Sequence, residues 1–392
     1  SKRIDSVSSF KVMDIFVRAK ELEQEGRSII HLSVGQPQTG APSLVLHEAS
    51  KAIFDNKIGY TDSLGIKPLR EKISEHYRDV YCVEIPYSRI VITTGSSAAF
   101  LLAFLCFFDA GDKVAVASSS YPCYRNILNS LGCVVKTIPV NSRFKVTANE
   151  LKEFIGKCSD LKGIVLSSPS NPTGSMLTKE EVSDLAKLCE QSGIWFISDE
   201  IYHGISYNCL KAETALKHSP SSIVINSFSK YYSMTGWRLG WIVVPENFVG
   251  AVNRLSQNLY INAPTLSQLA AVKAFDCLGE LNEHVEKYEI NRNLLLKGLG
   301  EIGFQKIAPS DGAFYIYIDA SDMVHDTIHM TRDLLESGGV AVIPGNDFED
   351  PKSGLGSKRF RISYCGSRVD VENGILRIKE WWVGYQGKVK KA

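Results

Sequence analysis

The sequence predicts an α/β protein with a large domain and a smaller one. The large domain is expected to hold a mostly parallel seven-stranded sheet covered by helices. Two observations predict it. From about residue 90, short runs rich in β-branched residues recur, with helical stretches such as 179–192 between several of them. Most of these runs are continuously apolar, which is typical of strands buried on both faces of a parallel sheet.

The first elements are predicted to be helices. Apolar residues at helical spacing predict the first one: Val12, Ile15, Phe16, Ala19 and Leu22. Ser8 or Ser9 is its expected cap, and Gly26 its expected end. A second helix is expected from Pro42 to about Asn56. The run 98–108 is too short to span a bilayer, and it predicts a buried helix.

The remaining elements define both domains. The expected strands of the large sheet are 89–93, 113–117, 134–139, 163–167, 194–198, 222–226 and 239–244. A long helical region, 247–300, follows. The smaller α/β domain is built from the N-terminal segment and the C-terminal part, with expected strands 312–319, 340–343 and 360–364 and helices 327–337 and 369–382. The predicted division is 1–43 for the N-terminal arm and small-domain segment, 44–295 for the large domain and 296–392 for the small C-terminal domain.

Composition excludes several functions. The chain has 392 residues, 44 basic and 43 acidic side chains and a net charge of +1. This balance gives no electrostatic footprint for nucleic acid or an anionic membrane surface. The nine cysteines are scattered, and no pair has CxxC spacing, so neither a disulfide framework nor a metal site is predicted. Free, mostly buried thiols suit a cytoplasmic protein. Cys123 alone falls in a segment that follows a predicted strand.

The carboxyl ends of the predicted strands carry the chemistry, because ligands bind at that edge of an open parallel sheet. Five segments follow the strands: Thr94–Ala98, Ser118–Tyr124, Ser168–Gly174, Asp199–His203 and Ser227–Lys230, with Gly236–Gly240 just beyond. Small residues at a helix start expose backbone N–H groups to an anion. The other segments add aromatic rings, an amide, a carboxylate, a phenol, a lysine and an arginine.

One ligand uses all of these groups. Pyridoxal phosphate is a planar, phosphorylated heteroaromatic aldehyde whose enzymes need a Schiff-base lysine and an acidic partner for the ring nitrogen. Each segment alone has an ordinary structural explanation. A lysine after a strand is usually a surface lysine, Asp-Glu usually caps a helix, and SNPTG is a good turn sequence. Their joint order and placement favour the cofactor site.

The same segments resemble those of a known family. SSPSNPTG, SDEIYH and SFSKYYSMTGWRLGW are similar to the signature segments of class I/II aminotransferases, the aspartate aminotransferase superfamily of fold type I. Further matching segments are SVGQP, GYTDSLGIKPLR, TTGSSAA, DGAFYIYID, GVAVIPGNDF and RFRISYCGS. The resemblance covers nearly the whole chain in family order, and it implies a pyridoxal-phosphate-dependent enzyme.

The resemblance implies catalytic and ring-binding roles. Lys230 is the expected Schiff-base lysine, and Asp199 the expected partner of the pyridinium nitrogen. Tyr121 is expected to stack on the ring, and Asn171 and Tyr202 to bond its 3′-oxygen. Asp199 should have a lowered pKa beside the cationic ring. Desolvation should lower the pKa of Lys230, which lets it act as nucleophile and then as general base and acid.

The resemblance also implies residues for the phosphate and the substrate. The phosphate is expected on Ser96, Ser97, Ser227 and Arg238. Tyr60 is expected to reach the phosphate of a neighbouring subunit, which implies a homodimer. Arg361 is the expected clamp for the substrate α-carboxylate, with Asn171 in the same pocket and Gly35 on its lid side. Arg359 lies two residues away and competes for this role, but the Arg-Ile-Ser context favours Arg361.

The expected activity is transfer of the amino group of an L-α-amino acid to a 2-oxo acid, with 2-oxoglutarate as the expected acceptor. Acidic-substrate members of the family use a cation for the distal carboxylate. At the two familiar positions this chain has Gln257 and Ser97, so the donor stays open and neutral or aromatic side chains are favoured. A carbon–sulfur lyase or aminocyclopropane-carboxylate-synthase-like enzyme shares nearly every residue. A cofactor-binding regulator is the third alternative, and it would need an added DNA-binding domain.

Overall fold

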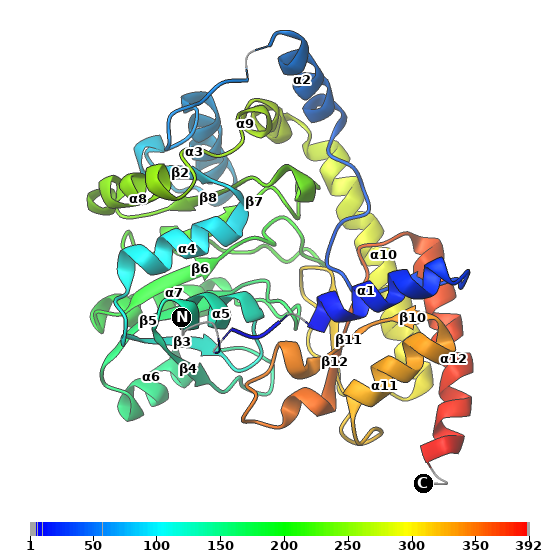
Figure 1. The fold of residues 1–392 in the computed structure, drawn as a ribbon. Coiled ribbons are helices and arrows are strands. Elements are labelled where there is room, and N and C mark those ends of the chain that lie inside the picture. Colours follow the sequence, from blue (N-terminus) through cyan, green and yellow to red (C-terminus); the bar gives the residue numbers. More distant parts are fainter. Residues whose placement is uncertain (1–4, 6, 10, 57, 390–392) are drawn as a thin grey trace.

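The computed structural model describes residues 5, 7–9, 11–56 and 58–389. In Figure 1 a large sheet with helices on both faces occupies one side of the molecule. Helices α1 (Lys11–Gln24), α11 (Thr327–Asp333) and α12 (Arg368–Val389) gather around smaller sheets on the other side. Helix α10 (Leu278–Ile302) connects the two parts: Leu281 packs in the core of the large sheet, whereas Leu295 packs in the smaller core.

The large sheet has the predicted seven strands, in the order β2-β8-β7-β6-β5-β3-β4. Their bounds are β2 Ile90–Thr93, β3 Lys113–Ala117, β4 Val134–Ile138, β5 Leu161–Ser167, β6 Trp195–Asp199, β7 Ile223–Ser227 and β8 Gly240–Val243. Strand β8 pairs antiparallel with β2 and β7, and the other neighbours pair parallel. Six strands therefore end at one edge of the sheet, which confirms the predicted fold class.

Both faces of the sheet are buried, as the continuous apolar runs predict. On strand β5, Ile164 packs in one core and Val165 in the other. The first core is covered by α3 (Lys67–Tyr81), α6 (Ala148–Lys157), α7 (Lys179–Gln191) and α9 (Thr265–Ala271). The second is covered by α4 (Gly95–Phe107), α5 (Pro122–Ser130) and α8 (Glu246–Leu259). Helix α2 (Ser43–Phe54) packs at the outer end, on α9.

The smaller part joins the two ends of the chain. Strands β9 (Tyr315–Asp319), β11 (Ile343–Pro344) and β12 (Arg359–Ser363) form an antiparallel sheet in the order β11-β12-β9. Strand β1 (Ile30–His31) pairs with β10 (Val340–Ala341). Helix α1 buries Ala19 and Leu22 against Leu335 and Ala341. The N-terminal segment therefore packs with the C-terminal part.

Three local expectations differ from the structure. Ser8 and Ser9 do not cap α1; Asp347 does, because its carboxylate accepts hydrogen bonds from the N–H groups of Lys11 and Val12, both 2.9 Å long. The helical region 247–300 is interrupted before Pro264, where Ile261 adopts a left-handed φ of 69°. The expected strand 340–343 is split, because β10 pairs with β1 and β11 with β12. Tertiary contacts decide the first and the third, whereas the second lies at Pro264, which has no N–H to continue a helix.

The structure shows the state of the cysteines and the character of the helices. The structure describes all nine cysteines, each is a free thiol, and five of them are buried. Among the described residues, no helix combines the length and the apolar character that a membrane crossing requires.

Truncating a side chain that packs between the large sheet and its covering helices should lower stability. We expect Ile164→Ala, at a fully buried position, to lower the free energy of unfolding by about 2–5 kcal/mol, because it leaves a cavity beneath the helices. Leu376→Ala, at an exposed position on α12, should change it by less than about 0.5 kcal/mol. Urea unfolding followed by tryptophan fluorescence measures both, and equal losses would contradict the assigned core.

Candidate active site

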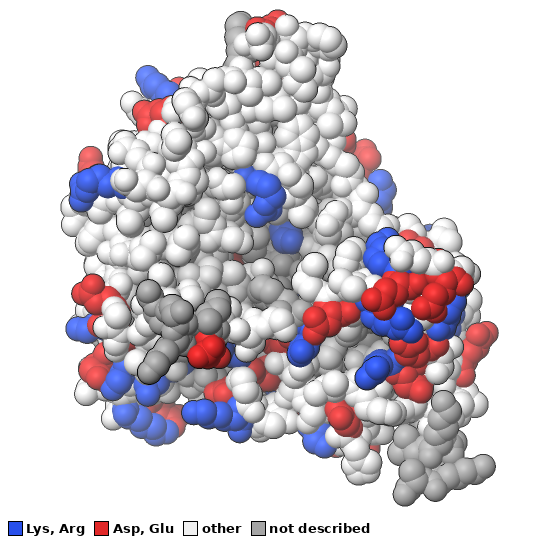
Figure 2. Space-filling model, in the orientation of Figure 1, with Lys and Arg blue, Asp and Glu red and all other residues white. Residues whose placement is uncertain are grey.

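A cavity of about 310 Å³ lies at the carboxyl edge of the large sheet, where the smaller part meets it. Figure 2 shows Lys or Arg side chains in and beside a hollow at the centre of the face in view. Acidic and basic side chains intermingle along the lower edge of that face. The cavity is lined by most of the residues expected from the sequence: Gly35, Ser96, Ser97, Tyr121, Asn171, Asp199, Tyr202, Lys230, Arg238 and Arg361. Strands far apart in the sequence bring them together.

Lys230 follows β7 and reaches into this cavity. Its Nζ donates a hydrogen bond to the carbonyl oxygen of Gly35, at 2.7 Å. Burial lowers the pKa of Lys230 to about 8, with a smaller contribution in the same direction from Arg361 and Arg238. This direction agrees with the sequence analysis. About a tenth of the amine is therefore neutral and nucleophilic at pH 7, far more than for a solvent-exposed lysine.

Asp199 ends strand β6 and is buried. Its Oδ1 accepts the Ile201 N–H at 3.1 Å, and its Oδ2 accepts the hydroxyl of Tyr124. Burial raises the pKa of Asp199 to about 6, while these hydrogen bonds and Lys230 oppose the rise. The expected lowering of this pKa depends on a cationic ring beside the carboxylate; within the protein chain alone, desolvation is the larger effect. Tyr124 is a functional candidate that the sequence analysis missed.

The start of helix α4 lies against the guanidinium of Arg238, an arrangement that suits an anion. Gly95 opens the helix with φ 73°, and a Cβ there would lie 2.5 Å from the Arg238 guanidinium. Ser96, Ser97, Ser229 and Thr235 add hydroxyls to the cavity wall. Ser227 is not on this wall; its buried hydroxyl bonds the Ser229 hydroxyl at 2.9 Å and the Leu239 carbonyl at 3.0 Å. Ser229, on the cavity wall and in contact with Ser227, is therefore a further candidate for the phosphate beside the predicted Ser227.

Arg361 is held in a fixed plane. One guanidinium nitrogen donates to Oδ1 of Asn171 at 2.8 Å, and another to the Ser33 carbonyl at 2.7 Å. The rings of Tyr315 and Phe348 lie 4.3 and 4.6 Å from the guanidinium carbon. Within the part of the chain that the structure describes, the buried Nε has no hydrogen-bond partner. A planar fork with an unused donor suits bidentate recognition of a carboxylate.

Arg359 is excluded from this role by its own ion pairs. It binds Glu349 at 3.0 Å and Asp319 at 3.2 Å. Glu349 also accepts the hydroxyl of Ser119, which follows strand β3. The pair of arginines on β12 is therefore divided: Arg359 fastens the smaller part to the large sheet, and Arg361 faces the cavity.

Tyr315 joins the two halves of the cavity. Its hydroxyl bonds the Tyr202 hydroxyl at 2.9 Å, while its ring lies on Arg361. A Cβ at Gly35 would lie 1.8 Å from the Tyr315 hydroxyl oxygen. The absence of a side chain at Gly35 therefore makes room for this tyrosine. Sequence reasoning singled out the surrounding segment DGAFYIYID but not Tyr315 itself.

His203 fastens the loop after β5 to the loop after β6. Its Nε2 lies 3.0 Å from the Ser168 carbonyl, and its Nδ1 2.8 Å from the Tyr81 hydroxyl. Burial lowers the pKa of His203 to about 3, so the ring is neutral. Because a carbonyl only accepts, Nε2 carries the proton and Nδ1 accepts from Tyr81. This tie holds the segment that contains Asn171 against the segment that contains Tyr202.

Three residues of interest lie outside the cavity. Tyr60 is 84% exposed. Gln257 is exposed on α8 and donates to the Ser63 hydroxyl at 3.3 Å. Cys123 is buried beneath the site, and its burial raises the thiol pKa to about 12, so it is unreactive. The structure thus places neither the expected partner-subunit residue nor this cysteine in the site of its own chain.

The remaining donor set fits pyridoxal phosphate. The helix start, hydroxyls and guanidinium at one end match a phosphate. The buried carboxylate of Asp199 matches a protonated ring nitrogen. A lysine of lowered pKa matches an aldehyde, and Tyr121 borders the same cavity. Arg361 adds a carboxylate site beside them.

Comparison with known proteins agrees with this geometry. The family profile described as "Aminotransferase class I and II" matches residues 27–378. The valine–pyruvate aminotransferase of Mycobacterium tuberculosis is 44% identical over 96% of each chain. The (5-formylfuran-3-yl)methyl phosphate transaminase of Methanocaldococcus jannaschii is 37% identical over 97% of this chain and 99% of its own. A crystal structure of an aminotransferase from Mycobacterium tuberculosis superposes with a TM-score of 0.94, covering 98% and 99% of the two chains at 44% identity.

These matches define a class of enzyme: pyridoxal-phosphate-dependent transaminases of fold type I. The chain belongs to the class I and II aminotransferase family. Its cofactor is pyridoxal 5′-phosphate, and its substrates are amino acids and 2-oxo acids.

Adding one methyl group at Gly35 should disorder the site. Gly35→Ala would drive a Cβ into the Tyr315 hydroxyl, so we expect Tyr315 to leave both Tyr202 and Arg361 and kcat/KM to fall about 100-fold. Gly40→Ala is the matched control, since nothing lies within 4 Å of a Cβ there. Steady-state kinetics of both variants checks this, and wild-type values for Gly35→Ala would contradict the assigned packing.

The pKa of Lys230 should control covalent cofactor loading. In protein freed of cofactor, we expect the second-order rate of loading to rise about tenfold per pH unit and to level off near pH 8, because the neutral amine reacts. Absorbance of the bound cofactor measures the rate, and Lys230→Ala should show no covalent loading. A rate that kept rising to about pH 10, as for a solvent-exposed lysine, would contradict the effect of burial.

Proposed function

We propose that this aminotransferase takes L-α-amino acids with apolar side chains as amino donors. One observation carries the proposal: the described residues that line the cavity include only three basic side chains, Lys230, Arg238 and Arg361. Each has a proposed partner that does not depend on the substrate side chain: the cofactor aldehyde, the cofactor phosphate and the substrate α-carboxylate. The lining also includes the apolar side chains of Val12, Met13, Val34 and Phe348. An acidic donor would leave its distal carboxylate without a cation.

The name of the Mycobacterium tuberculosis relative, valine–pyruvate aminotransferase, supports an aliphatic donor. For the acceptor, the family resemblance predicts 2-oxoglutarate. The same missing cation favours a smaller 2-oxo acid without a second carboxylate, such as pyruvate. We propose the small 2-oxo acid as the preferred acceptor, with 2-oxoglutarate as the alternative to be measured beside it.

We propose the following roles within the site. Arg361 binds the substrate α-carboxylate through two parallel N–H groups, which fixes the direction of the Cα–H bond. Lys230, once its amine is free, takes the proton from the substrate Cα. It then donates that proton to the cofactor carbon that receives the amino group. Asp199 holds a proton on the ring nitrogen. Bound pyridoxal phosphate supplies the carbon that carries the amino group and a ring that accepts electrons.

We further propose that the binding residues orient the cofactor from three sides. Ser96, Ser97, Ser227 and Arg238, with Ser229 beside Ser227, hold the phosphate at the start of α4, where N–H groups and the helix dipole favour an anion. Asn171 and Tyr202 meet the oxygen on the ring, and Tyr121 covers its face. Asn171 also accepts from Arg361, so one amide couples cofactor position to substrate position.

We propose a homodimer in which Tyr60 reaches the neighbouring site. Tyr60 is 84% exposed and Phe54 86%, and Leu46 and Ile53 on α2 are also exposed. Exposed apolar side chains grouped on one helix are typical of an interface. A monomeric holoenzyme in sedimentation experiments would contradict this proposal.

The domain division 1–43, 44–295 and 296–392 and a cytoplasmic location also stay proposals. Helix α10 crosses the proposed boundary at 295, and the free thiols are consistent with a reducing compartment. Limited proteolysis tests the division, and cell fractionation tests the location.

The donor proposal predicts a clear order of substrates. With pyruvate as acceptor, we expect kcat/KM for L-valine to exceed that for L-aspartate by roughly 100-fold, because the aspartate side chain would be buried without a counter-charge. Formation of the 2-oxo acid products, separated by chromatography, measures both. Equal or higher activity with L-aspartate would overturn the proposal, although the enzyme would remain an aminotransferase.

Adding a cation should shift that order. Ser97→Lys places an ammonium group at the cavity wall, so it should raise the aspartate-to-valine ratio of kcat/KM about tenfold. Ser97→Met, of similar length and no charge, is the matched control. An equal change in both variants would mean that side-chain size, not charge, limits aspartate.

A further inference from the structure

Tyr124 touches the catalytic carboxylate, and no part of the proposed function uses it. We propose that Tyr124 is a positioning residue that keeps Asp199 ionised and correctly directed against the ring nitrogen of the bound cofactor. The inference rests on the role proposed above for Asp199. It deepens that role by assigning the side chain that sets the proton affinity of the carboxylate.

The hydrogen bonds of Asp199 single out Tyr124. Among the described residues, its carboxylate accepts from two groups, the backbone N–H of Ile201 on Oδ1 and the hydroxyl of Tyr124 on Oδ2. The first is a main-chain donor that any residue at 201 other than proline would supply. Tyr124 is therefore the side chain through which the sequence controls this carboxylate. An O–H donor on a buried carboxylate makes a strong, charge-assisted hydrogen bond.

The phenol of Tyr124 is held rigidly. It is fully buried, its ring lies 4.9 Å from that of Phe100, and it meets Tyr121 edge-on at 5.6 Å between ring centroids. It sits at position three of α5, which begins with Pro122 directly after the Tyr121 platform. The same short segment therefore supplies the ring platform and the donor to Asp199.

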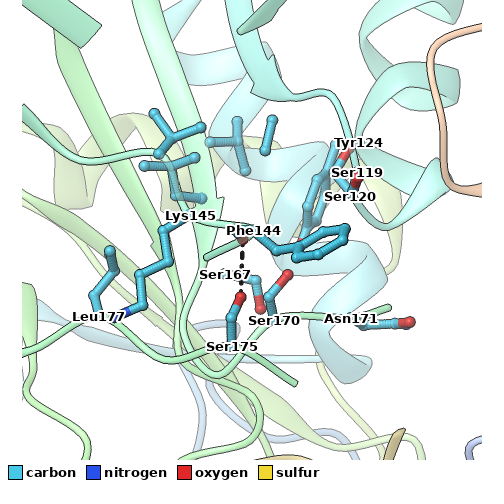
Figure 3. A pocket seen from close by; sticks show the side chains of 14 residues that line it. Ser119, Ser120, Tyr124, Phe144, Lys145, Ser167, Ser170, Asn171, Ser175 and Leu177 are labelled. Atoms are coloured by element: carbon cyan, nitrogen blue, oxygen red, sulfur yellow. Dashed lines mark hydrogen bonds between the residues drawn. The ribbon is translucent and has the colours of Figure 1, made fainter. Parts of the chain in front are cut away.

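Tyr124 lines the active-site cavity and also a second, smaller cavity of about 30 Å³. Figure 3 shows Tyr124 beside Ser119 and Ser120 on one side of this cavity, with Ser167, Ser170 and Ser175 across from it. The Ser175 hydroxyl is already used, because it donates to the Phe144 carbonyl at 2.9 Å. Ser167 is a further hydrogen-bonding neighbour of Tyr124.

Other titratable groups near Asp199 do not replace this donor. Five other titratable residues interact electrostatically with Asp199: Lys230 after β7, Glu200 next in the chain, Tyr121 and Cys123 in the segment after β3, and Tyr202 after β6. Lys230 lowers the pKa of Asp199 only through its charge. That charge changes during the reaction, as Lys230 gives and takes protons. Tyr124 keeps its proton, because burial raises its pKa well above the usual value.

Loss of the Tyr124 hydroxyl should change the proton affinity of Asp199 in a direction that follows from the hydrogen bond. Without the donor, the carboxylate of Asp199 is less stable, so its proton affinity rises. The shared proton then moves from the ring nitrogen toward Asp199, and the ring loses positive charge. A less positive ring would withdraw fewer electrons from Nζ of Lys230, which is bonded to the cofactor in the holoenzyme. The pH midpoint at which the visible absorbance of the resting holoenzyme changes should therefore move upward.

The test compares three variants of the holoenzyme by pH titration of visible absorbance. Tyr124→Phe keeps the ring volume and removes only the hydroxyl, and we expect its midpoint to rise by about one pH unit. We expect kcat to fall by roughly tenfold or more, with KM for the amino acid within about twofold. Tyr77→Phe is the control. It removes a fully buried hydroxyl that accepts from Trp241 at 3.1 Å, and its midpoint should stay at the wild-type value.

Asp199→Asn separates failure of this inference from failure of the proposed function. A midpoint that moves in Asp199→Asn but not in Tyr124→Phe overturns the role of Tyr124 and leaves Asp199 in place. A midpoint that moves in neither overturns the role of Asp199 and with it the inference. An equal shift in Tyr77→Phe would show a general effect of a lost buried hydroxyl and would also overturn it. Thermal unfolding midpoints confirm that each variant is folded.

Discussion

The shared direction of six strands is the constraint on which the rest of this structure depends. Strands buried on both faces must be covered by helices, and right-handed crossovers then return every strand to the same edge. The segments after β2, β3, β5, β6 and β7 therefore meet, although residues 94 to 230 separate the first from the last. The site is a consequence of this alignment, because no single segment carries enough chemistry to bind the cofactor.

Burial then supplies the electrostatics. The same exclusion of water lowers the pKa of Lys230 and raises that of Asp199, which weakens the charge on both groups. Lys230 uses this shift, since a neutral amine is nucleophilic. Asp199 must resist it, and its two hydrogen-bond donors do so. Desolvation therefore favours the function of Lys230 and opposes that of Asp199. Hydrogen-bond donors from neighbouring elements offset it at Asp199.

The smaller part completes the site and fixes its geometry. Arg361 comes from β12, its aromatic neighbours Tyr315 and Phe348 from β9 and the segment after β11, and its acceptors from residues 33 and 171. Five regions of the chain must therefore be in place before the carboxylate fork is formed. Arg359, two residues earlier on the same strand, serves the contact between the two parts through Glu349 and Ser119.

The sequence by itself determined the fold class, the seven strands, the cofactor and most of the residues that line the cavity, because apolar periodicity and residues at strand ends are local signals. It did not show that Ser229 lies on the cavity wall beside Ser227, or that Asp347 rather than Ser8 or Ser9 caps α1. Nor did it identify Tyr124 or Tyr315. Their importance comes from hydroxyl groups that meet partners 75 and 113 residues away, and only the tertiary structure decides such pairings.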